Sequence, residues 1–159
     1  MKNLLLTAAV LLATTTSFAA ASGTLDISGT VLPINDIAIT ANTNNNNSLN
    51  ITGGETDKNV ASADETSNNL NGYKIMLSSL NSSKLVHGVN SSYSTNYTVS
   101  YAGGAAATLT TTPQEVKDSG ALTGLTTVTS QITVSVSAYP TAPAGTYSDT
   151  ITVSIVANQ

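Results

Sequence analysis

The chain has 159 residues, of which only 9% are charged, and its formal net charge at pH 7 is −4. Lysine and arginine together number five, so the chain lacks the clustered cations from which nucleic-acid binding draws its affinity. It contains no cysteine, which excludes thiol catalysis and cysteine metal sites. These figures exclude several functional classes and leave a weakly charged domain rich in small polar residues.

Residues 1–21 have the organisation of a secretion signal. Lys2 supplies a positive start, Leu4–Ala13 is an apolar run, and Ala19–Ala21 fits a cleavage site with small residues. Cleavage after Ala21 makes Ser22 the first mature residue, and cleavage after Ala19 also fits. The apolar run is far shorter than the roughly 20 residues that a membrane-spanning helix needs. We therefore expect export, through the periplasm to the cell surface.

Residues 22–33 follow as a predicted N-terminal arm. Within Thr24–Val31, one face of an extended strand would carry Leu25, Ile27, Gly29 and Val31, and the other face would be polar. Such a segment fits two roles: the first strand of the chain's own sheet, or an arm that completes the sheet of a neighbouring molecule. Pro33 favours a break between this segment and the body in either case.

Residues 34–159 are long enough for one domain with a core, and strand patterns recur along them with turn signals between. In chain order, the predicted strands are Asp36–Thr40, Leu49–Ile51, Tyr73–Leu77, Leu85–Val86, Tyr97–Tyr101, one around Leu109, Ile132–Ala138 and Tyr147–Ile155. The last two are predicted to form a long antiparallel pair, and residues 114–119 to form either a helical turn or a loop. The pattern predicts an all-β, immunoglobulin-like sandwich of seven or eight strands.

Polar segments offer candidates for binding. Asn42–Asn50 is interpreted as a solvated loop, with an adhesive or ice-facing surface as the alternative. Glu55 and Asp57 come closer to a cation site, although solvated loop charges explain them as well. Asp64 and Glu65 would face opposite ways in a strand, and could bind calcium weakly in a loop. We predict no metal site and no cofactor.

Catalytic constellations are missing from the sequence. His87 is the only histidine, and no Gly-x-Ser-x-Gly elbow accompanies it. Asp149 has the same parity as Tyr147 and Ile151, so it is either a buried hydrogen-bonding group or a residue at a sheet end that water reaches. We therefore do not expect an enzyme.

With the strands laid out, the chain resembles chaperone–usher pilins, the subunits of bacterial fimbriae, of the spore-coat-U-like archaic or colonisation-factor-type branch. The resemblance rests on the size, on a signal followed directly by Thr24–Val31, and on Gly72–Leu77, Tyr97–Gly104 and Pro143–Val156. The last of these is similar to the Pro-x-Gly-x-Tyr-x-Asp-x-hydrophobic ending of such subunits. Many family members carry a disulfide, which this chain lacks.

The resemblance implies an incomplete sandwich, closed by the N-terminal donor strand of a neighbouring copy. The donor strand would plug the groove with Leu25, Ile27, Gly29 and Val31, and the acceptor groove would be formed by Ile37, Ile39, Ile151, Val153 and Ile155. The implied partners are copies of the chain, a periplasmic chaperone, an outer-membrane usher and a tip adhesin.

Two functions from different classes follow. The first is a structural fimbrial subunit that polymerises by donor-strand exchange and contributes to adhesion or biofilm formation. The alternative is a self-contained, secreted β-sandwich that binds sugar, a cation or ice through the Asn-rich loop or the threonines at 108–112.

Overall fold

The computed structural model describes residues 21–159. The chain divides into two compact units, with the boundary between Val31 and Leu32. The predicted signal peptide lies outside the described residues except for Ala21. Within residues 21–159, no helix is long and apolar enough to cross a membrane.

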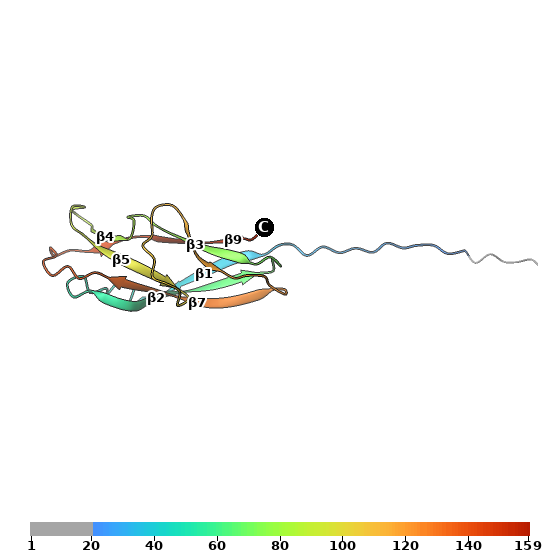
Figure 1. Cartoon of the computed structure of the whole chain (residues 1–159), viewed down its shortest axis with the longest axis horizontal. Helices are drawn as coiled ribbons and strands as arrows, with labels where there is room; N and C mark the ends of the chain where they lie inside the picture. The colour runs from blue at the N-terminus through green and yellow to red at the C-terminus, as the bar shows by residue number, and fades with distance from the viewer. Residues whose placement is uncertain (1–20) are drawn as a thin grey trace, which may run out of the picture. The chain divides into compact units, whose positions relative to one another are not determined.

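The unit Leu32–Gln159 is all-β (Figure 1). Its strands are β1 (Asn35–Ala41), β2 (Glu55–Ser67), β3 (Tyr73–Ser79), β4 (Lys84–His87), β5 (Ser94–Tyr101), β6 (Gln114–Asp118), β7 (Thr126–Val136), β8 (Tyr147–Ser148) and β9 (Ile151–Ala157). One sheet has the order β1-β2-β7-β5-β4-β8, and the other has the order β6-β3-β9. Every strand pairing within the two sheets is antiparallel, and the two sheets form a sandwich, as predicted.

The core lies between the two sheets. β3 supplies Tyr73, Ile75 and Leu77 from the smaller sheet, each at most 1% exposed. The facing sheet supplies buried residues from β2, β5 and β7, among them Val99 and Ile132. These side chains alternate along their strands because successive residues of a strand point to opposite faces.

The predicted pairing of the last two long strands is wrong. β7 pairs with β2 and β5, whereas β9 pairs with β3 in the other sheet. The run that the sequence pattern joins from Tyr147 to Ile155 is divided at Asp149 and Thr150. The two residues before this division pair with β4, and those after it pair with β3, so the chain changes sheets here.

Two further strand predictions are wrong, and two strands were missed. Leu49 and Ile51 lie in a loop and turn, and Leu109 lies outside the strands although its side chain is completely buried. Residues 114–118 form β6 rather than a helical turn or loop. β2 has 13 residues and was not predicted. In the half of β2 away from Glu55, the inward residues are Ala61, Ala63, Glu65 and Ser67, all of which are buried. None of them is large and apolar, so the sequence shows no alternation of apolar residues that would predict a strand here.

Candidate functional site

An apolar groove runs between two edge strands of the sandwich. β1 is the edge of one sheet and β9 is an edge of the other, and the two lie side by side. In the part of the chain that the structure describes, they are not paired as neighbouring strands. The gap holds a cavity of about 230 Å³, lined by Ile39, Ala41, Asn46, Leu49, Val60, Ala61, Leu85, Tyr97, Ile132, Val134, Asp149, Ile151 and Val153.

The walls of the groove are apolar side chains that are only partly buried. Ile39 on β1 is 46% exposed, and Ile151 and Val153 on β9 are only partly buried. In a closed sandwich, the inward residues of a strand are covered by the opposite sheet and by neighbouring strands. Here, Ile39, Ile151 and Val153 still face an open space. The floor of the groove is core, because Val60, Ile132 and Val134 are buried.

The structure brings three of the five predicted acceptor residues to this cavity. Ile39, Ile151 and Val153 line it. Ile37 and Ile155 do not line the cavity, but both are partly buried against the core. The floor residues on β2 and β7 were not predicted, because the sequence of an edge strand does not show which other strands form the floor of the groove next to it. Leu49 was predicted to be in a strand, and instead it lines the groove from a loop.

Asp149 marks one end of the groove. Its carboxylate accepts hydrogen bonds from Ser79 Oγ (2.5 Å), Tyr97 Oη (2.7 Å) and the backbone N–H of Asn81 (2.9 Å). Burial, with the hydrogen bond to Asp149, raises the pKa of Tyr97 well above its ordinary value. A more polar cavity of about 390 Å³ continues from this end and is lined by Tyr147 and Ser148 among others. Asp149 is thus a partly buried hydrogen-bonding group at the point where the chain changes sheets.

The predicted donor residues lie in the other unit. Leu25 and Ile27 are each 87% exposed, and Val31 is 85% exposed. A Cβ atom placed on Gly29 would have no neighbour within 4 Å. No residue from 21 to 34 belongs to a strand. The segment therefore presents an alternating row of exposed apolar side chains.

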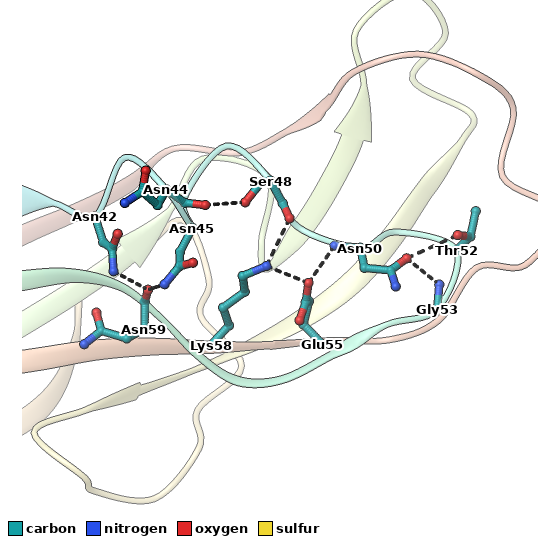
Figure 2. Close-up of polar contacts among 10 residues, drawn as sticks. All are labelled: Asn42, Asn44, Asn45, Ser48, Asn50, Thr52, Gly53, Glu55, Lys58 and Asn59. Carbon is teal, nitrogen blue, oxygen red and sulfur yellow. Dashed lines mark hydrogen bonds and ion pairs between the residues drawn. The ribbon is translucent and has the colours of Figure 1, made fainter.

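The Asn-rich segment forms a loop between β1 and β2, in agreement with its interpretation as a loop (Figure 2). The side chains of Asn42 and Asn45 donate to the backbone oxygen of Asn59, at 3.3 and 2.8 Å. Lys58 Nζ donates to Ser48 O at 3.0 Å, so β2 holds the far part of the loop as well. Much of the loop's polarity is thus used in holding its own fold.

The carboxylate groups weighed as cation ligands have other partners. Glu55 Oε1 lies 2.8 Å from Lys58 Nζ and accepts the backbone N–H of Asn50 (Figure 2). The hydrogen bonds to Lys58 and Asn50 lower the pKa of Glu55. Asp57 accepts a hydrogen bond from Ser135 Oγ at 3.1 Å. Among residues 21–159, no group of three or more His, Asp or Glu side chains is placed to hold a metal ion.

Glu65 is completely buried on β2, and its neighbour Asp64 points to solvent, so the two face opposite ways. Both carboxylate oxygens of Glu65 are used: Tyr101 Oη donates to one and Tyr73 Oη to the other, each at 2.6 Å. Lys117 Nζ donates to the second oxygen at 2.7 Å. Burial alone would raise the pKa of this carboxyl, but the Lys117 ammonium and the hydroxyl donors outweigh it and lower the pKa.

Both ring nitrogens of His87 form hydrogen bonds with the backbone. Its Nδ1 accepts the backbone N–H groups of Val89 and Asn90, which places the ring proton on Nε2, 3.1 Å from Ala144 O. Its ring meets the ring of Tyr147 edge-on, with centroids 5.1 Å apart. Both nitrogens are therefore occupied by the backbone, which leaves neither for a substrate.

Comparison with protein-family models and with curated proteins found no match for this chain.

Proposed function

We propose that this protein is a structural subunit of a bacterial surface fimbria, which polymerises when the N-terminal arm of one copy fills the groove between β1 and β9 of another. The observation that carries the proposal is the groove itself: two edge strands lie side by side without pairing, over an apolar floor. A single extended segment placed there could pair with both edges and close the sandwich.

The arm has the complementary chemistry. Its apolar residues alternate with polar ones, so one face can enter the groove while Asp26, Ser28 and Thr30 remain outside. Burying the three aliphatic side chains Leu25, Ile27 and Val31 would contribute about 5–8 kcal/mol, at about 1.5–3 kcal/mol each. Hydrogen bonds to the two edge strands would add to this value.

An open edge on a sheet is a hazard in a soluble domain, because it can pair with any other strand. β1 and β9 present two such edges next to each other, with β-branched side chains between them. Polymerisation through the arm would cover both edges along the whole fibre. A periplasmic chaperone and an outer-membrane usher would then be the partners that protect the groove before assembly and direct the exchange.

The test compares surface extracts of cells that express the full-length chain, signal included, with extracts of cells that express the same chain without residues 22–31. Each is run on SDS gels with and without boiling. We expect a ladder of oligomers that collapses on boiling and is absent for the shortened chain. A folded monomer in every unboiled lane of the full-length protein would refute the proposal and favour a self-contained binding module.

A further inference from the structure

Asn68, the first residue after β2, binds the segment that precedes β1. Its side-chain Oδ1 accepts the backbone N–H of Ile34 at 2.7 Å, and its Nδ2 donates to the backbone oxygen of Leu32 at 2.9 Å. Its own backbone N–H donates to Ile34 O at 3.2 Å. We call these three bonds the Asn68 clamp.

The clamp extends the pairing of β1 with β2 beyond the end of the sheet. The last pair of the ladder joins Asn35 to Ser67, and the backbone bond from Asn68 continues it by one residue. Beyond that point, the Asn68 side-chain amide supplies one hydrogen-bond acceptor and one donor, in place of the backbone C=O and N–H of a neighbouring strand. Pro33 has no N–H group and restricts Leu32 to extended conformations, so the segment suits this arrangement.

This connection limits how the arm can reach the groove of its own chain. A strand parallel to β1 would need a crossover of about a dozen residues or more, and only Leu32, Pro33 and Ile34 separate Val31 from β1. The remaining route is a tight hairpin that turns at these three residues and runs back along β1. A hairpin requires the turn residues to leave the extended form, which breaks the side-chain bonds of the clamp.

We propose that the Asn68 clamp prevents the arm from entering the groove of its own chain and so reserves the groove for the arm of a second copy. This inference rests on the proposed function. Asn68 acts as a positioning residue: it does not line the groove, and it directs the arm through Leu32 and Ile34. An arm tethered to its own domain would otherwise compete at a high effective concentration with every arm offered by another copy.

The experiment uses the absence of cysteine from the chain. Ser28→Cys and Thr40→Cys are introduced together, since both residues have the parity opposite to the apolar face of their segment. Isotope-labelled and unlabelled mature chains are unfolded, mixed, refolded and joined with a short bismaleimide. Mass spectrometry of the linked peptides then distinguishes the two kinds of linkage. A link within a chain joins two peptides that carry the same isotope label, whereas links between chains also join a labelled peptide to an unlabelled one.

The comparison is made in four backgrounds: unchanged, Asn68→Ala, Asn68→Asp and Asn44→Ala. Asp keeps the acceptor for Ile34 and loses the donor to Leu32, and Asn44 is an exposed loop asparagine that serves as the matched control. We expect linkage between chains in the unchanged and Asn44→Ala backgrounds. Asn68→Ala should raise linkage within the chain about fivefold or more, and Asn68→Asp should give an intermediate rise.

The outcomes separate the two proposals. Equal linkage within the chain in the unchanged and Asn68→Ala backgrounds overturns the role of the clamp, while linkage between chains still supports the proposed function. No linkage of either kind, with the arm open to protease in every assembly state, overturns the proposed function and this inference with it. A urea midpoint measured for each variant shows whether the domain itself has folded.

Discussion

The ammonium group of Lys117 on β6 lies 2.7 Å from the carboxylate of Glu65 on β2, so an ion pair joins the two sheets of the sandwich. The Glu65 side chain is fully buried, and that of Lys117 is 20% exposed. Two tyrosines, one from each sheet, donate to the same carboxylate. In a chain without cysteine, this cluster is a non-covalent connection through the core.

Replacing Glu65 with Ala should destabilise the domain strongly. The change leaves Lys117 and the hydroxyls of Tyr73 and Tyr101 without their shared acceptor, and breaking a buried pair from one side costs about 3–5 kcal/mol. Because water can still reach part of Lys117, we expect a loss of about 3 kcal/mol in urea unfolding. The matched control is Glu115→Ala, which removes the exposed ion pair with Lys74 and should cost less than about 1 kcal/mol. Equal losses for the two variants would contradict the importance of the buried cluster.

Acid should weaken the same cluster. The pKa of Glu65 is lower in the folded protein than the ordinary value of a glutamate, so the charged form contributes stability above the unfolded pKa of about 4.3. This stability is lost as the pH falls through the lower, folded value. We expect the free energy of unfolding to decrease from pH 5 towards pH 2, and to decrease less in Glu65→Gln. Urea titrations at several pH values measure this, and parallel curves for both proteins would count against it.

Gly72 is needed for the turn between β2 and β3. It has φ of +83°, and a Cβ atom there would lie 1.8 Å from the backbone oxygen of Gly120. Gly72→Ala should therefore cost at least about 2 kcal/mol, because the strain of a positive φ and a backbone clash add together. Gly103 has φ of +73° with nothing within 4 Å of such an atom, so Gly103→Ala isolates the cost of φ, at about 1–2 kcal/mol. Thermal unfolding of the two variants compares them, and a smaller loss at Gly72 would contradict the clash.

Polymerisation should depend on one face of the arm only. Ile27→Asp would place a charge in the apolar groove and should abolish the heat-sensitive ladder, because an unpaired buried carboxylate is too costly. Ser28→Asp lies on the other face and should leave the ladder unchanged. Gel analysis with and without boiling distinguishes the two, and loss of the ladder in both variants would show that the arm does not insert as a strand.

Several strands could be predicted from the sequence because their inward residues are large and apolar. β3 and β5 follow from Tyr73, Ile75 and Leu77 and from Tyr97, Val99 and Tyr101, all of which are buried. β2 escaped prediction because its inward residues past Val60 are small or polar, and Glu65 is buried only with partners from other strands. The three groove residues Ile39, Ile151 and Val153 were predicted from parity and a family resemblance, whereas the floor of the groove was not.

The amino-acid sequence by itself determined the all-β class, because alternation with a period of two is a local property of each segment. It also determined that Leu25, Ile27 and Val31 share one face. Only the tertiary structure decided that β7 and β9 lie in different sheets, that β1 and β9 are edges beside each other, and that Asn68 holds the segment before β1. These relationships join residues far apart in the chain. Strand pairing therefore depends on which strand edges come together when the core packs, and local sequence patterns do not contain this information.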